Sequence, residues 1–293
     1  MEAKRNIEEI IDTTVNSIIK EYTQRKGIIL PEGVNYNESA DSFTFNFQQD
    51  NERDIIKLTK VGYKVNLFNH TYYYGYQFEN NVDSNKRTAF IHSIKFPDGK
   101  INNKDKNTFI INAVNKLDSD ISLPKYKLIV YPESMSEINR DMIKYLNRFT
   151  APEIATMEMI KDLPKNIEFD YNRFYLEILN SKLENGRDRY TQKQKDEVIN
   201  SIKQIMNDIH NLNYFSIARN MKKTKFRQYI KNYYTFKNEE DKKLFQTILN
   251  NNVLIIDDIV TSGTTISYLL NSLRSVNDSN NIVIFSLIGK NIN

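Results

Sequence analysis

The hydrophobic positions divide the chain into an amino-terminal part of mixed pattern and a carboxyl-terminal part with longer regular elements. Apolar residues recur at helical spacing between Ile7 and Tyr22, which predicts one amphipathic helix that ends near Gly27. Alternation of apolar and polar residues then predicts a small antiparallel sheet within residues 27–102. Its four expected strands cover residues 43–47, 63–67, 72–76 and 90–94, and a helix over 108–117 follows.

The pattern changes after Pro124. Residues 127–131 form a short, continuous apolar run, which is typical of a strand buried on both faces. We expect a helix to begin at Ser134. Residues 153–212 show helical periodicity, so we expect only helices there, separated by a polar hinge at 184–194.

Residues 251–273 contain the strongest candidates for a functional site. Residues 253–256 predict a buried parallel strand, and two carboxylates, Asp257 and Asp258, follow it directly. A turn of small residues and a helix through Leu273 come next. The turn consists of Thr261, Ser262, Gly263, Thr264 and Thr265. Open α/β folds bind ligands at such turns, beyond the carboxyl ends of their strands.

The turn is suited to a phosphate dianion, because free amides and the helix dipole attract an anion and Gly263 admits a close approach. Two acids would repel a phosphate alone. They suit a ligand that also presents hydroxyls or develops positive charge, and a ribose 5-phosphate that ionises at C1 does both. Neither GxxxxGK[ST] nor GxGxxG occurs in the chain. The alternative is an ordinary turn with an N-cap cluster.

The segment VLIIDDIVTSGTT resembles the phosphoribosyl pyrophosphate (PRPP) motif of type I phosphoribosyltransferases. The resemblance covers residues 127–149 and 212–289 and implies an α/β fold with a parallel-sheet phosphoribosyltransferase-type core. We expect a helical insertion at about 150–211. An N-terminal α+β domain at 1–118, with the small antiparallel sheet, is a candidate hood for the acceptor, and the phosphoribosyltransferase-like domain covers 119–293.

The resemblance also implies an enzyme that transfers the 5-phosphoribosyl group of PRPP to a nitrogen nucleophile, a base or an amine, and releases pyrophosphate. Asp257 and Asp258 would be the catalytic residues, holding the ribose hydroxyls and a Mg²⁺ ion, directly or through water. The turn at 261–265 would bind the 5-phosphate. We also expect a homodimer.

Two segments are candidates for the pyrophosphate. In the family an earlier strand ends in a pyrophosphate loop, which places Ser134, Met135 and Ser136 in that role. The alternative is that Ser134 and Glu137 form a capping box. Glu133 also departs from what a pyrophosphate loop requires, unless a metal ion intervenes.

The second candidate is a basic segment, residues 219–227, within a stretch from Ile209 to Asn238 that has no acidic residue. The family closes a flexible basic loop over the active site. Here Arg219, Lys222 and Lys223 would neutralise the leaving pyrophosphate. The layout is similar to that of competence-associated phosphoribosyltransferase-like proteins. The alternative is a solvated basic face, or nucleic-acid binding through the basic-aromatic segment 219–237 with stacking on Tyr229, Tyr233 and Tyr234.

The amino-acid composition excludes some of the possible functions and site types. The 293 residues include 41 basic and 37 acidic side chains, and a net charge of +4 does not favour nucleic-acid binding. The absence of cysteine excludes disulfides, thiol catalysis and Cys-ligated zinc, and the three histidines form no metal motif. No apolar run could span a membrane, so we expect a cytoplasmic protein. A non-catalytic PRPP- or nucleotide-binding protein with a regulatory or structural role is the alternative to an enzyme, because no hood can be recognised.

Overall fold

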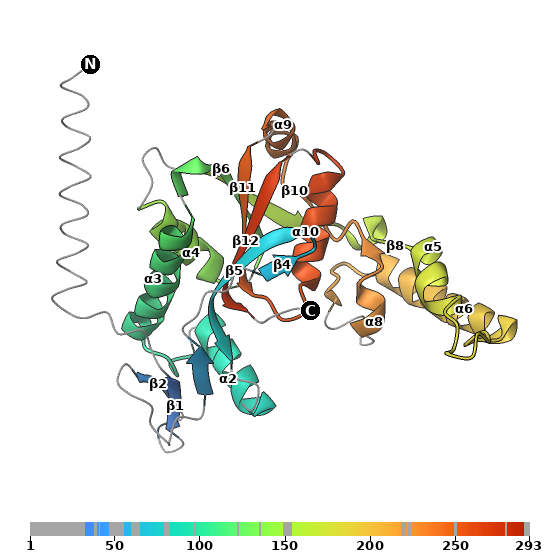
Figure 1. Ribbon diagram of the computed structural model, residues 1–293, viewed down its shortest axis with the longest axis horizontal. Coiled ribbons are helices and arrows are strands. Elements are labelled where there is room, and N and C mark those ends of the chain that lie inside the picture. The colour runs from blue at the N-terminus through green and yellow to red at the C-terminus, as the bar shows by residue number, and fades with distance from the viewer. Residues whose placement is uncertain are drawn as a thin grey trace. The chain divides into compact units, whose positions relative to one another are not determined.

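The computed structural model describes residues 33–37, 40, 42–46, 56–59, 65–78, 83–96, 98–121, 123–134, 136–148, 154–217, 221, 224–248, 251–278 and 280–289. The helix expected at residues 7–22 lies outside them. The chain divides into two compact units, Met1–Gly62 with Gly75–Leu117, and Tyr63–Tyr74 with Asp118–Asn293. Their elements carry the labels of Figure 1.

The first unit contains the expected small antiparallel sheet. Strands β1 (Gly33–Asn37) and β3 (Ile56–Thr59) pair antiparallel, and β1 also pairs with β2 (Ser42–Asn46). On its other edge β3 pairs with the last residues of β5 (His70–Phe78). Helix α3 (Asn103–Asp120) confirms the predicted helix at 108–117. Buried aromatic rings form the core of this unit, namely Phe43, Phe45, Tyr76, Phe90 and Phe109.

The strand predicted at residues 90–94 is wrong, because these residues belong to helix α2 (Ser84–Lys95). The Asp83 carboxylate caps the helix by accepting bonds from two first-turn amides. Phe90 and Ile94 stand one helical turn apart and are both fully buried. Over so short a run, apolar residues four positions apart fit both the period of a helix and the period of a strand. The Asp83 cap stabilises the helix.

The second unit is built on a mainly parallel sheet, which confirms the predicted α/β fold class. Strands β7 (Ala155–Lys161), β6 (Tyr126–Pro132), β11 (Asn252–Ile259) and β12 (Asn281–Gly289) pair parallel in that order. Strand β10 (Tyr234–Phe236) pairs antiparallel with β7, and the first part of β5 lies beside β12. Antiparallel to β5 runs β4 (Val65–Leu67). These strands confirm the predictions at 127–131, 253–256 and 72–76.

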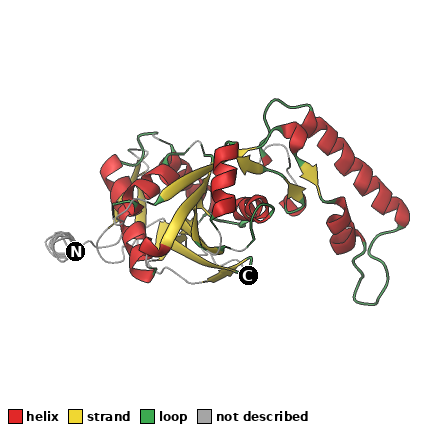
Figure 2. Cartoon of the chain, turned by 90° about the horizontal axis from the view of Figure 1, so that it is seen from above, coloured by secondary structure: helices red, strands yellow, loops and turns green. Residues whose placement is uncertain are grey.

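Helices join the parallel strands, as parallel connections require. Helix α4 (Ile138–Leu146) connects β6 to β7, and α10 (Thr264–Arg274) connects β11 to β12. Figure 2 colours these elements by class. The remaining elements of the unit are η1 (Leu123–Lys125), η2 (Pro164–Asn166), β8 (Glu168–Phe169), α5 (Tyr171–Phe174), the π-helix η3 (Tyr175–Leu179), α6 (Gln192–His210), α8 (Thr224–Arg227), β9 (Ile230–Lys231) and α9 (Glu239–Thr247).

The prediction of helices only over residues 153–212 is wrong for the first part of that segment. Strand β7 is a full member of the parallel sheet, and β8 forms a short ladder with β9. Met157 and Met159 are both buried while Glu158 between them is less so, which is the two-residue period of a strand. The helical predictions around Phe174 and Ile202 are confirmed. None of the helices in the described part of the chain combines the length and apolar character that a membrane crossing needs.

Candidate functional site

The two acids of the motif lie inside β11, near its carboxyl end, rather than after it as the sequence suggested. Asp257 and Asp258 are only 5% and 4% exposed. The Asp258 amide donates to Asp257 Oδ1 at 2.9 Å. Of the two, Asp257 lines the hollow that follows β11, and Asp258 is the next residue of the same strand.

The turn after β11 encloses a small hollow. The hollow has a volume of about 30 Å³ and is lined by Asp257 and residues 259–265. Gly263 has the left-handed φ of +71° and is the N-cap of α10, so no side chain caps the amides of the first turn. The Ser262 and Thr264 hydroxyls are hydrogen-bonded to each other at 2.7 Å. The structure therefore brings all five predicted turn residues and Asp257 together around one cavity.

A hairpin that the sequence did not connect with the site packs on this turn. An ideal Cβ on Gly263 would lie 3.1 Å from Phe68 Cε2 and 3.3 Å from Leu67 Cδ1. Phe68 and Asn69 form the two-residue turn between β4 and β5, with φ of +51° and +66°. Such a turn favours Asn and Gly, so a phenylalanine there is strained. The sequence alone could indicate only the turn. Its contact with Gly263 could not be predicted, because the two lie almost 200 positions apart in the chain.

The predicted pyrophosphate loop follows β6, the strand next to β11. Ile255 pairs with Val130, so Asp257 stands at the level of Pro132 and the two loops leave the same edge of the sheet. Ser134 is half-buried and Ser136 is 5% exposed. Met135 lies outside the described residues. The two candidate loops are therefore neighbours.

The capping box between Ser134 and Glu137 is absent. Helix α4 begins only at Ile138, and its N-cap Glu137 makes no side-chain capping bond. The Ser134 hydroxyl instead accepts from the Ser136 amide at 3.1 Å, and the Ser136 hydroxyl accepts from the Ile138 amide at 3.2 Å. Because the helix starts four residues after Ser134, that serine is outside capping range.

Glu133 joins the loop after β6 to the end of β7. Its amide donates to Met159 O at 2.7 Å, and its carboxylate accepts from the Lys161 amide at 3.1 Å. The Lys161 ammonium donates to the Tyr214 hydroxyl at 3.0 Å. Sequence reasoning missed Lys161 and Tyr214, because 53 residues separate two side chains that only the fold brings together.

Two buried tyrosines, Tyr72 and Tyr234, lie close enough to the acids to feel their charge. Burial, followed by Asp257, Tyr233, Asp258 and Glu133, raises the pKa of Tyr234 well above its usual value. Burial and the Asp257 charge also raise the pKa of Tyr72, although its hydrogen bond to Ser286 lowers it. These phenols therefore stay protonated around the carboxylates at neutral pH.

The aromatic part of the alternative nucleic-acid surface is not available. Tyr229, Tyr233 and Tyr234 are 1%, 7% and 6% exposed, and all three belong to the hydrophobic core. Their rings cannot stack on bases, because they are enclosed by other side chains. Their spacing along the sequence reflects core packing.

Within the basic segment the structure describes Met221 and residues 224–227. Arg219, Lys222 and Lys223 lie outside the described residues. The Arg227 guanidinium donates through Nε to Met221 O at 2.9 Å, and the Tyr268 hydroxyl of α10 donates to the Arg227 carbonyl. The carboxyl-terminal end of the segment is thus attached to the helix that follows the phosphate turn.

The donor set suits magnesium without forming a complete cage. No group of three or more His, Cys, Asp or Glu side chains that could hold a metal occurs among the described residues. Magnesium is usually held by one or two carboxylates together with substrate phosphates. Asp257, which lines the hollow of the turn, is a carboxylate that could take part in such a site.

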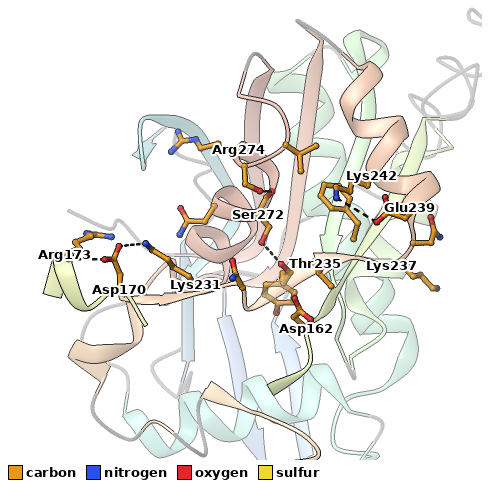
Figure 3. Close-up of a pocket in the computed structure, with 17 residues that line it drawn as sticks. Asp162, Asp170, Arg173, Lys231, Thr235, Lys237, Glu239, Lys242, Ser272 and Arg274 are labelled. Carbon is orange, nitrogen blue, oxygen red and sulfur yellow. Dashed lines mark hydrogen bonds and ion pairs between the residues drawn. The ribbon is translucent and has the colours of Figure 1, made fainter. Parts of the chain in front are cut away.

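A larger cavity, of about 930 Å³, lies elsewhere on the second unit and is shown in Figure 3. Its walls come from β9, β10, the start of α9 and the last turns of α10, and no described residue of the predicted site lines it. Each of its basic side chains has an acidic partner within 4.0 Å. These pairs are Arg173–Glu177, Lys231–Asp170, Lys237–Glu158, Lys242–Glu239 and Arg274–Asp278. Each basic side chain of the lining is therefore already paired with an acid.

Comparisons with known proteins do not assign the chain to a family. No protein-family model matches the chain, and no curated protein matches it. Among solved structures, the chain is similar to a hypoxanthine phosphoribosyltransferase from Staphylococcus aureus, with a TM-score of 0.32 and 15% identity. The match covers 63% of this chain and 65% of that chain. Values this low do not establish membership of a family.

Proposed function

We propose that the protein is a type I phosphoribosyltransferase that transfers the 5-phosphoribosyl group of PRPP to a nitrogen nucleophile, a base or an amine. One observation carries the proposal. The left-handed Gly263, the open amino end of α10 and the buried Asp257 surround one hollow, directly beside the loop that follows β6. This arrangement offers an anion site and a carboxylate to a single ligand.

In this proposal each group of predicted site residues has its own role in the reaction. The turn at 261–265 binds the 5-phosphate, and Asp257 and Asp258 accept hydrogen bonds from the ribose hydroxyls and hold Mg²⁺, directly or through water. The metal supplies charge that neutralises the pyrophosphate. The bond between C1 and the pyrophosphate oxygen breaks, the nitrogen bonds to C1, and the acceptor loses one proton. Ser134, Met135 and Ser136, with Arg219, Lys222 and Lys223, hold the pyrophosphate as it leaves.

The test is to replace each acid by its amide. Asp257→Asn and Asp258→Asn should lower the rate of pyrophosphate release from PRPP and Mg²⁺ by at least about a hundredfold, since each loses charge at the developing cation. Asp196→Asn is the matched control, because Asp196 is exposed on α6 and only accepts from Gln192. Free bases and simple amines would be screened as acceptors. Turnover unchanged in both variants would exclude the assignment.

A non-catalytic PRPP- or nucleotide-binding role is the second candidate. Glu133 favours it, since its carboxylate stands where the leaving pyrophosphate would need positive charge. Calorimetry with PRPP distinguishes the two, because a binding protein would give heat of binding without pyrophosphate release. We also propose a domain boundary at 118/119 and a homodimer.

A further inference from the structure

We infer that His70 is a positioning residue for the turn at 261–265, and that protonation of its ring weakens the binding of a sugar phosphate there. The turn then holds its ligand at neutral pH and releases it in acid. The inference rests on the proposed function and adds a regulation of that same site by pH.

The hairpin of β4 and β5 contacts both ends of helix α10. At the amino end, Leu67 and Phe68 lie against Gly263, the N-cap of the helix. At the carboxyl end, Nε2 of the His70 ring lies 2.7 Å from a guanidinium nitrogen of Arg274. Leu67 pairs with His70 across the hairpin, so His70 also closes the two-residue turn that presents Phe68. A change at His70 can therefore reach the turn at 261–265 through one hairpin.

The bond between His70 and Arg274 exists only while the histidine is neutral. A guanidinium donates hydrogen bonds and cannot accept them, so Nε2 of His70 accepts and the imidazole proton is on Nδ1. Protonation of Nε2 removes the acceptor and places a second positive charge beside the first. The two cations then repel each other, and the hairpin loses its attachment to the last turn of α10.

Among the described residues, Arg274 and Asp278 are the charged groups that act on His70. Strands β4 and β12, which lie beside this part of β5, contain no charged residue. Asp278 follows α10 and lies 3.4 Å from Arg274. Burial and the Arg274 charge lower the pKa of His70, although a backbone bond to Ile282 and the Asp278 charge oppose them. The ring is therefore neutral at neutral pH and takes up its proton only in acid.

The first test follows the binding of ribose 5-phosphate by calorimetry between about pH 8 and pH 5, the range in which histidine changes charge. The affinity of the wild-type chain should fall by roughly tenfold more than that of His70→Gln, because glutamine accepts from Arg274 throughout this range. The phosphate of the ligand itself ionises near about pH 6, and comparison of the two proteins removes this effect. His92→Gln, on α2 of the other unit, is the matched control and should behave as the wild type.

The second test follows the ring itself by NMR. The chain has three histidines, and the signal that His70→Gln lacks identifies His70. Its titration midpoint should lie below about pH 6.5, and the affinity should fall as the pH passes below that midpoint. Bound ribose 5-phosphate should lower the midpoint by about one pH unit, because linkage between proton and ligand is reciprocal. Arg274→Met should raise the midpoint, since it removes the neighbouring charge.

The inference is overturned if the wild-type chain and His70→Gln lose affinity equally in acid, or if the ligand leaves the His70 midpoint unchanged. A purely structural role for His70 would give no shift of that midpoint on ligand binding. Failure of ribose 5-phosphate to bind the wild-type chain at about pH 8 would instead overturn the proposed function, and the inference with it.

Discussion

Gly263 shows how one residue can serve both backbone geometry and ligand access. Its φ of +71° is costly for any residue with a Cβ, and the space where that Cβ would go is occupied by Phe68 and Leu67. A glycine therefore lets the turn fold back between the hairpin and the hollow. The chain provides a comparison in Gly186, which has a φ of +78° but no heavy atom within 4 Å of an added Cβ.

These two glycines predict a separation of stability from binding. Gly186→Ala should lower the free energy of unfolding by about 1 kcal/mol, from backbone strain alone, and leave ribose 5-phosphate binding unchanged. Gly263→Ala should cost more than that and weaken ribose 5-phosphate binding by at least about tenfold, because the turn must move. Urea unfolding and calorimetry would measure both effects. Equal ligand affinity in the two variants would show that the turn does not bind the phosphate.

At the scale of elements, the hairpin of β4 and β5 supports the turn at 261–265. Asn69 holds the second position of its turn at a φ of +66°, which asparagine and glycine tolerate and alanine does not. Asn69→Ala should lower the free energy of unfolding by about 1 kcal/mol and weaken ribose 5-phosphate binding, because Phe68 would leave Gly263. Asn69→Gly is the control and should retain both properties. An unchanged affinity in Asn69→Ala would separate the hairpin from the site.

Elements with a long hydrophobic pattern could be predicted from the sequence, whereas the identity of short elements depends on local hydrogen bonds. The four apolar residues before Asp257 and the turn after it identify β11 and the start of α10 directly. The segment around Phe90 and Ile94 fits two periods, and the Asp83 cap that makes it helical lies outside the run. In strand β7 buried and exposed positions alternate over only a few residues. The helical periodicity of the segments that follow therefore led to a helix prediction there. Local pattern alone could not resolve these cases.

At the scale of the whole molecule, the site depends on contacts that no local pattern contains. The turn and the two acids could be identified from consecutive residues, because the chemistry is contiguous there. Lys161, Tyr214 and Phe68 reach the same sheet edge or the same turn from distant parts of the chain. Their positions follow from strand order and hairpin packing, which the sequence specifies only through the complete fold.

The same packing encloses many phenols, and this predicts how the protein responds to alkali. Burial raises the pKa of Tyr126 and of Tyr233 to about 12, and it raises the pKa of Tyr72, Tyr76, Tyr234 and Tyr268 as well. An unfolded tyrosine titrates near about pH 10. Above that pH the unfolded chain loses phenolic protons first, so the stability that is complete below it falls as the pH approaches the folded values.

Urea midpoints should therefore be steady up to about pH 10 and fall between about pH 10 and pH 12. The tyrosinate absorbance that comes from the buried phenols should rise together with unfolding and not before it, because these phenols ionise only when the chain opens. Tyr126→Phe removes one such phenol and should make the fall shallower, by up to about 1.4 kcal/mol per pH unit. Midpoints that stay constant over that range would mean that water reaches these rings in the folded protein.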